Sequence, residues 1–206
     1  MIVIADYGMG NLHSVLKAFR RLRVDAVISN NPEEIINADK LILPGVGNFK
    51  RGMKNLKEMN LIDPLNTAVL EKNTPILGIC LGMQLMTKYS EEGNTEGLGW
   101  IDAETIRFDF SQYDNSFLHI PHIGWNNAAS DSENLLFKNL DHETTFYFIH
   151  SYYVNCKQED TIAAVTKYGN TFVSAISKNN IFATQFHPEK SHDSGLNLLK
   201  NFIDRT

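Results

Sequence analysis

The stretch PILGICLGMQ, residues 75–84, decides the fold of this chain. An apolar run leads into Cys80, which stands between Gly78 and Gly82 at the start of a helical pattern. A strand, a sharp turn and a helix around a nucleophile form a nucleophile elbow, written here with cysteine in place of serine. Small flanking residues allow the turn, which would project the thiol from the edge of a sheet. The stretch therefore predicts a cysteine nucleophile on an α/β fold.

The start of the helix would assist such a nucleophile. Its dipole favours the thiolate, and the backbone N–H of Leu81 can face a developing oxyanion. The competing interpretation is that Cys80 is a small buried side chain beside packing glycines, since free cysteine is among the most buried residue types.

The first ninety residues alternate short apolar runs with helical patterns. This alternation predicts parallel strands joined by helices, with helices on both faces of the sheet. The expected strands are residues 2–6, 25–29, 40–44 and 75–79, and the expected helices are 11–22, a short one starting at 31–34, 48–72 with a break near 63–64, and 81–90.

Beyond Gly93 the pattern becomes strand-rich. A hairpin turn is expected at residues 167–171, and a closing helix at about 195–203. The expected strands are residues 104–110, 146–154, 161–169, 171–177 and 181–188. We therefore expect a mixed sheet with an antiparallel arm, in a single domain over residues 1–206.

Composition excludes several functions. The chain has 206 residues, 43% of them hydrophobic, and a formal net charge of -5 without a basic stripe, so no nucleic-acid partner is expected. No run approaches the ~18 apolar residues of a membrane span, and a cytoplasmic protein is expected.

The two cysteines cannot form a disulfide framework. The histidine spacings lack the helical i, i+4 geometry of a zinc site, so neither a metal nor a cofactor is expected.

A cysteine nucleophile needs a base and a group that orients the base. His187 and Glu189 lie two residues apart around Pro188, which favours extended backbone. Side chains two apart in an extended segment point the same way. Cys80, His187 and Glu189 are thus predicted to form a triad. His150 is the competing base, but it lies in an aromatic strand without a nearby carboxylate.

Motifs along the whole chain resemble the class I, triad-type glutamine amidotransferases. GICLGMQ (78–84) and FHPE (186–189) carry the likeness to the class. YGMGNL (7–12), PGVGNF (44–49), IPHIGWN (120–126), HSYY (150–153) and HPEKS (187–191) resemble the glutaminase subunit of imidazole glycerol phosphate synthase.

The resemblance implies a flavodoxin-like or Rossmann-like α/β fold and a glutaminase reaction. Cys80 would attack the glutamine side-chain amide, His187 would protonate the leaving ammonia, and water would hydrolyse the glutamyl thioester while Glu189 holds His187. By the same resemblance, the glutamine and its oxyanion would be held by Val46, Gly47, Leu81, Gln84, His150, Ser151 and Tyr152.

The resemblance also implies a partner that consumes the ammonia. In the family this is a (β/α)8-barrel cyclase of histidine biosynthesis, and Asn11, Trp125 and Lys190 match positions that meet it. Two departures resemble instead glutaminases that supply a barrel partner in the synthesis of amino-modified surface sugars. These are His192 after the HPEKS motif, where the histidine-pathway family usually has glutamine, and Trp100 in place of a smaller aliphatic residue.

Two further classes remain open from the sequence. The opening Gly8-Met9-Gly10 could belong to a nucleotide-binding module, although His13 stands where a third glycine is expected. A cysteine hydrolase of peptides or small molecules could use the same elbow.

Overall fold

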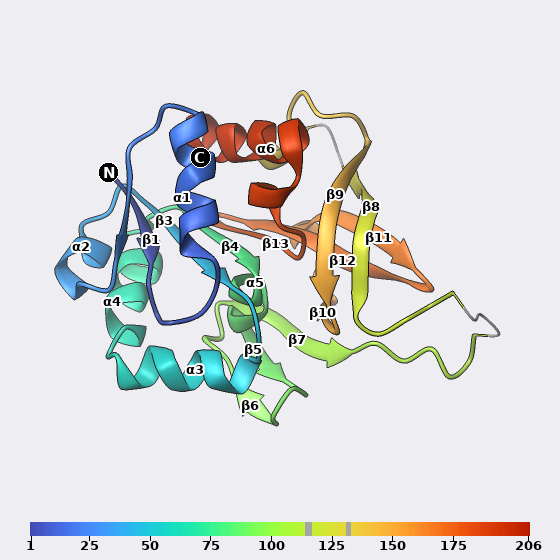
Figure 1. The fold of residues 1–206 in the computed structure, drawn as a ribbon. Coiled ribbons are helices and arrows are strands. Elements are labelled where there is room, and N and C mark those ends of the chain that lie inside the picture. Colours follow the sequence, from blue (N-terminus) through green and yellow to red (C-terminus); the bar gives the residue numbers. More distant parts are fainter. Residues whose placement is uncertain (114–116, 131–132) are drawn as a thin grey trace.

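The computed structural model describes residues 1–113, 117–130 and 133–206. In these ranges thirteen strands join in one sheet. Figure 1 shows helices packed against both faces of its left half and a strand-rich arm extending to the right. The mixed sheet and the antiparallel arm expected from the sequence are therefore confirmed.

Five parallel strands form the half of the sheet that carries the elbow, in the order β2-β1-β3-β4-β13. They are β1 (Ile2–Ala5), β2 (Ala26–Ser29), β3 (Lys40–Gly45), β4 (Ile76–Cys80) and β13 (Ile181–Thr184). In the register, Cys80 pairs with Gly45 of β3, and Ile79 pairs with Thr184 of β13. The carboxyl ends of three neighbouring strands therefore meet beside Cys80.

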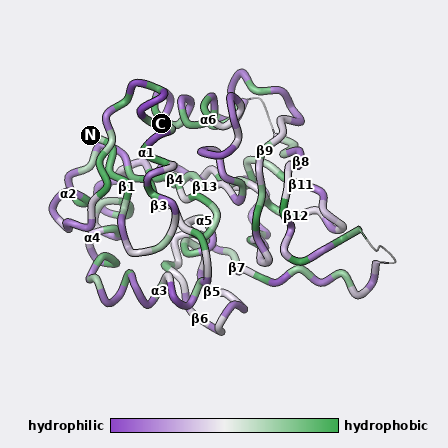
Figure 2. The backbone as a smooth tube through the Cα atoms, viewed as in Figure 1, coloured by the Kyte–Doolittle hydropathy of each residue, from purple (hydrophilic) through white to green (hydrophobic). Residues whose placement is uncertain are grey.

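The helices divide between the two faces, each with its own apolar core. Phe19 of α1 and Phe202 of α6 belong to one core, and Leu56 of α3 and Leu85 of α5 belong to the other. The helices are α1 (Leu12–Arg21), α2 (Pro32–Ile36), α3 (Phe49–Glu58), α4 (Ile62–Asn66), a π-helical turn (Thr67–Glu71), α5 (Leu81–Leu85) and α6 (His192–Arg205). Figure 2 shows hydrophobic residues concentrated along the central strands and hydrophilic ones along the outer helix faces.

The antiparallel arm begins at β12 (Asn170–Lys178), which pairs with β13. From there the sheet continues in the order β10-β7-β5-β6, and a branch from β12 runs through β11 and β8 to β9. The bounds are β5 (Thr87–Ser90), β6 (Thr95–Glu96), β7 (Ile101–Arg107), β8 (His122–Ser130), β9 (Glu143–His150), β10 (Tyr152–Cys156) and β11 (Ile162–Tyr168). Short 3-10 helices cover Leu135–Phe137, Glu159–Thr161 and Pro188–Lys190.

The prediction of one helix over residues 81–90 is wrong. The helix α5 ends at Leu85, and Thr87–Ser90 forms β5, parallel to β7. The hydroxyl of Thr87 donates to the carbonyl of Gln84 and lies 3.1 Å from the hydroxyl of Thr105 on β7. Strand pairing thus overrides the helical pattern of this segment, and β-branched Thr87 fits the strand.

Other boundaries also differ from the prediction. The expected strand 146–154 is two strands, β9 and β10, separated at Ser151, and the expected strand 104–110 is β7, which ends at Arg107. The strand β8, which pairs with β9 along its length, was not predicted. The closing helix is longer than expected, because α6 spans His192–Arg205.

The opening glycines allow two turns of the chain to approach closely. Gly10 has φ +103, and a Cβ there would lie 3.1 Å from the Cα of Gly45 at the end of β3. The loop after β1 therefore packs directly against the end of β3, next to the elbow. This packing accounts for Gly10 without a nucleotide.

Gly82 offers a test of how tightly the elbow is packed. A Cβ at this position would lie 1.7 Å from the carbonyl oxygen of Leu43, which belongs to the backbone of β3 and cannot rotate away. We expect Gly82→Ala to lower the free energy of unfolding by about 2–3 kcal/mol, as overpacking does. Urea unfolding measures this. The control is Gly52→Ala on α3, where the nearest atoms are movable methyl groups of Leu85. Equal stability of Gly82→Ala and wild type would contradict the packing.

Among the described residues, no helix combines the length and the apolar character needed to cross a bilayer.

Candidate active site

Cys80 has a backbone conformation that non-glycine residues rarely adopt, with φ 53 and ψ -105. Such strain costs about 1–3 kcal/mol and persists only where the surroundings impose it. Here β4 ends and α5 begins within one residue, so the chain must turn sharply at Cys80. The structure thus has the geometry of the predicted elbow.

His187 is held in place through its backbone. It follows β13, its N–H donates to the carbonyl of Tyr147 on β9, and its own carbonyl accepts from the hydroxyl of Ser191. The Ser191 hydroxyl also accepts from the N–H of Tyr147. These contacts hold the segment after β13 against β9. They fix the position of the backbone that carries the His187 ring.

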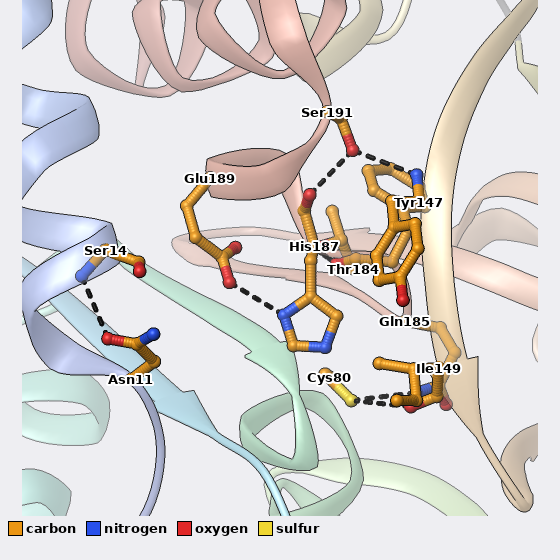
Figure 3. Close-up of polar contacts among 11 residues, drawn as sticks. Asn11, Ser14, Cys80, Tyr147, Ile149, Thr184, Gln185, His187, Glu189 and Ser191 are labelled. Carbon is orange, nitrogen blue, oxygen red and sulfur yellow. Dashed lines mark hydrogen bonds and ion pairs between the residues drawn. The ribbon is translucent and has the colours of Figure 1, made fainter. Parts of the chain in front are cut away.

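The His187 ring lies between Glu189 and Cys80, as Figure 3 shows. Its Nδ1 is 2.8 Å from Oε1 of Glu189, and both side chains are almost fully buried, at 1% and 3% exposed. Burial alone would lower the pKa of His187, but the charge of an ionised Cys80 and the contact with Glu189 raise it to about 10. The pair therefore favours an imidazolium beside the sulfur at neutral pH.

The Cys80 sulfur has two further polar neighbours. The thiol donates to the carbonyl of Ile149 at 3.8 Å, and the side-chain amide of Gln185 donates to the sulfur at 3.7 Å. Gln185 is fully buried. The sequence analysis did not single it out, although it lies directly after β13 and two residues before His187.

A cleft of about 590 Å³ opens above Cys80. Its lining includes all seven residues expected to hold glutamine and its oxyanion, from the loop after β3, from α5 and from the segment around Ser151. Glu92 and Lys190 also line it. Glu92 could not be selected from the sequence, because the strand β5 that precedes it was expected to be helical. A carboxylate in this cleft suits the ammonium group of an amino acid.

His150 lies in the cleft wall but is engaged elsewhere. Its Nδ1 contacts the carbonyl of Tyr152 at 2.8 Å, and its Nε2 contacts Nδ1 of His122 at 3.1 Å. Burial, reinforced by His122, lowers the pKa of His150 to about 3, and burial lowers the pKa of His122 to about 4. Both rings are therefore neutral at physiological pH. His150 has no free nitrogen to act as the base.

This neutral pair makes stability depend on pH. Below pH 6.5 the unfolded chain protonates both histidines while the native pair stays neutral down to about pH 4. Stability is thus present above pH 6.5 and is lost as the pH falls, by up to about 1.4 kcal/mol per pH unit for each histidine. The amide of glutamine can keep both hydrogen bonds of His122. We therefore expect His122→Gln to remove the contribution of His122 to this loss of stability and to leave that of His150. Urea unfolding at pH 7 and pH 5 measures it.

The control for this prediction is His119→Gln, at an exposed position. It should leave the loss of stability between pH 7 and pH 5 as in wild type. If His122→Gln also behaves as wild type, the neutral pair is not the source of the loss.

The three residues expected to meet a partner lie at different places around the site. Asn11 caps α1, where its side chain accepts from the N–H of Ser14, apart from Cys80 in Figure 3. Trp125 on β8 is 49% exposed and stacks on His192 with ring centroids 5.0 Å apart. The Lys190 ammonium lies over the Tyr147 ring. Trp100 is buried, so this departure from the family lies in the core and not on the rim.

No group of three or more metal-ligating side chains is found among the described residues. Cys156, the second cysteine, is buried on β10 and contacts the Thr161 hydroxyl at 3.4 Å.

The fold and the site together define a class: an α/β enzyme with a strained cysteine elbow and a buried histidine–carboxylate pair at the edge of a mixed sheet. The family model "Glutamine amidotransferase class-I" matches residues 3–206. Among solved structures, a glutamine amidotransferase has TM-score 0.74 at 20% identity, covering 98% of this chain and 99% of that one. The glutaminase domain of Trypanosoma brucei CTPS has TM-score 0.67 at 18% identity, covering 100% and 94%.

Curated relatives narrow the family further. Imidazole glycerol phosphate synthase subunit HisH 2 of Methanococcus maripaludis is 53% identical, covering 98% of both chains. Subunit HisH 1 of Campylobacter jejuni is 48% identical, covering 98% of this chain and 99% of that one. Subunit HisH 2 of Pseudomonas aeruginosa is 43% identical and covers 99% of both. The chain belongs to the class-I glutamine amidotransferases and, within them, to the family of imidazole glycerol phosphate synthase subunit HisH.

Proposed function

We propose that this chain is the glutaminase subunit of an imidazole glycerol phosphate synthase and supplies ammonia to a cyclase subunit in histidine biosynthesis. One observation carries the proposal. The strained Cys80 lies beside the buried His187–Glu189 pair, at the base of a cleft that also holds a carboxylate. Near-complete coverage by relatives named as this subunit supports the pathway.

Cys80, His187 and Glu189 act as a triad in this proposal. The Cys80 thiolate attacks the amide carbon of glutamine, and the backbone N–H of Leu81 and the Val46–Gly47 peptide stabilise the oxyanion. The His187 imidazolium gives its Nε2 proton to the departing ammonia, which leaves a glutamyl thioester. His187 then takes a proton from water, and the resulting attack releases glutamate and restores the thiol.

Contacts in the cleft support glutamine as the substrate. Both amide protons of Gln84 are used, toward the carbonyl of Tyr152 and toward Gln185. Gln84 can therefore offer only its carbonyl oxygen, an acceptor for an amide N–H of the substrate. Oε2 of Glu92 accepts from the N–H of Phe49 at the start of α3, and the other carboxylate oxygen can accept from the α-ammonium group. Ser151 and Tyr152 also line the cleft.

The ammonia acceptor is proposed to be a (β/α)8-barrel cyclase that docks over the cleft mouth. Ile123, Trp125 and Ile149 are exposed on the outer face of the β8–β9 pair, at 57%, 49% and 37%. Ile123 is directly opposite Ile149 in the register, and Ile149 also lines the cleft. This apolar face beside the mouth is suited to exclude water from the path of the ammonia.

The proposal is tested by measuring glutamate release by the purified chain, alone and with the barrel cyclase of the same organism. We expect weak hydrolysis alone, stimulation by the cyclase, and formation of imidazole glycerol phosphate from glutamine. Glutamine hydrolysis that ignores every barrel partner would favour an independent cysteine hydrolase. Micromolar NAD binding without glutaminase activity would favour the nucleotide-binding module.

A glutaminase of surface amino-sugar synthesis is the second candidate. The observation that favours it is His192, stacked on Trp125 where a partner would dock. The barrel protein that co-purifies with the chain decides between the two pathways. Cytoplasmic localisation and a single-domain chain stay predictions.

Asn11 gives a test of the docking surface. Because its side chain caps α1, alanine would also destabilise the helix, whereas serine keeps a capping oxygen. We expect Asn11→Ser to reduce cyclase stimulation of glutamate release several-fold while leaving the unstimulated rate unchanged. Asn31→Ser, the matching cap of α2, is the control. Full stimulation of Asn11→Ser would remove Asn11 from the docking surface.

A further inference from the structure

The carbonyl of Tyr152 receives two hydrogen bonds, and it fixes the orientation of a chain of buried groups. Nε2 of Gln84 lies 2.9 Å from this oxygen and Nδ1 of His150 lies 2.8 Å from it. A carbonyl only accepts, so both facing nitrogens must carry protons. This requirement assigns the Gln84 amide and the His150 tautomer.

The assignment propagates toward the nucleophile. The second amide proton of Gln84 is directed at Oε1 of Gln185, 3.0 Å away. Gln185 must therefore present its oxygen to Gln84 and its Nε2 to the Cys80 sulfur, at 3.7 Å. A flipped Gln185 would set two donors against each other at Gln84. The amide that faces the sulfur is thus a donor in a fixed orientation.

The assignment also propagates away from the nucleophile. With its proton on Nδ1, His150 accepts at Nε2 from Nδ1 of His122, and Nε2 of His122 accepts from Asn126 at 3.3 Å. The amide of Asn126 also donates to the carbonyl of Lys167. Each donor in this series of hydrogen bonds has an acceptor. The series requires that the imidazoles of His122 and His150 are both neutral.

We propose that Gln185 is a further catalytic residue, whose buried amide donates to the Cys80 sulfur and stabilises the thiolate. The Tyr152 carbonyl fixes the orientation of this amide through Gln84. When the Cys80 proton moves to Nε2 of His187, the sulfur keeps the electron pair and loses its own donor bond to Ile149. A hydrogen bond to a charged acceptor is about twice as strong as a neutral one, and an amide already in place needs no reorganisation. This role rests on the proposed function.

The test measures the reactivity of Cys80 itself, so it does not depend on glutaminase activity. The full chain carrying Cys156→Ala is alkylated with iodoacetamide across pH, with and without Gln185→Met or Gln185→Glu. We expect the midpoint of alkylation to rise by about one pH unit with methionine, and alkylation below the midpoint to slow about ten-fold. Glutamate, which adds a negative charge, should have the larger effect. Thr184→Val, which removes a buried hydroxyl that donates to the Phe186 carbonyl, should leave the midpoint unchanged.

Turnover gives a second readout. Gln185 does not line the cleft, so Gln185→Met should lower kcat about ten-fold or more with little change in KM. If the variants do not fold, the side-chain amide resonance of 15N-labelled Gln185 in the wild type should move as the pH crosses the alkylation midpoint. A folded Gln185→Met with the wild-type midpoint, or a stationary resonance, would overturn the proposal. Wild-type alkylation without glutamine hydrolysis would instead count against the proposed function.

Discussion

Replacing Cys80 by alanine is expected to lower glutamine-dependent turnover by at least about 10⁴-fold, the scale on which loss of a catalytic nucleophile acts. The sulfur is the group that forms the thioester, and none of the other residues lining the cleft offers a thiol in its place. The measurement is glutamate release by the chain in complex with the cyclase. Cyclisation driven by added ammonium salts should persist, because it bypasses the thioester.

The second cysteine, Cys156, serves as the control for this experiment. Cys156 is also buried and free, but it lies on β10 with Thr161 and the carbonyl of Asp102 as neighbours. Cys156→Ala should retain turnover within about two-fold of wild type. Glutamine-dependent turnover that survives in Cys80→Ala would remove the nucleophile from the proposed mechanism.

Glu189→Gln is expected to lower turnover by about 10³–10⁴-fold, as loss of the carboxylate does in other triads. The carboxylate contacts Nδ1 of His187 at 2.8 Å in a buried site. An amide of the same shape cannot balance the imidazolium, and its N–H can select the wrong tautomer. Glutamate release with the cyclase present measures the effect, and Glu104→Gln on the exposed face of β7 is the control.

The same variant has a signature in stability. Because the pKa of His187 is raised from 6.5 to about 10, its stabilisation is fully present below pH 6.5 and disappears as the pH rises through 10. Cys80 causes the larger part of this rise in the pKa and Glu189 the smaller part. Glu189→Gln removes the part from Glu189, so the variant should be most destabilised relative to wild type near pH 6 and least near pH 10. A destabilisation that does not change with pH would mean that Glu189 does not hold a charged His187.

The site could be predicted from the sequence wherever local rules govern it. The elbow is encoded by ten consecutive residues, and His187 and Glu189 lie two residues apart. The expectation that both share an extended segment is wrong, because Pro188–Lys190 is a 3-10 helix. The alternation of strands and helices predicted β4, and it predicted a strand at β13 that ends at Thr184 and not at residue 188 as expected. Parallel strands bring their carboxyl ends together. Gln185 lies two residues before His187, but nothing in the local sequence shows that its amide is aimed at the sulfur, since that depends on Gln84 and Tyr152.

The remaining differences have a tertiary cause. Thr87–Ser90 continues a helical pattern in the sequence, yet β7 offers it a pairing edge that no local rule contains. The same holds for β8, which was not predicted and which pairs with β9 along eight positions. Glu92 follows β5 into the cleft, so its place could not be found while β5 was taken as helix.

The conformation of Cys80 sets catalysis against folding. At φ 53, glycine would fit position 80 with less strain than any side chain. The sequence that folds best at this position is thus not the sequence that turns over glutamine. A redesign that selects only for thermal stability would replace Cys80 by glycine and lose the nucleophile. Selection for growth would keep the strained cysteine. Catalysis therefore depends on the surrounding packing, because the packing offsets the backbone strain that holds the Cys80 sulfur at the edge of the sheet.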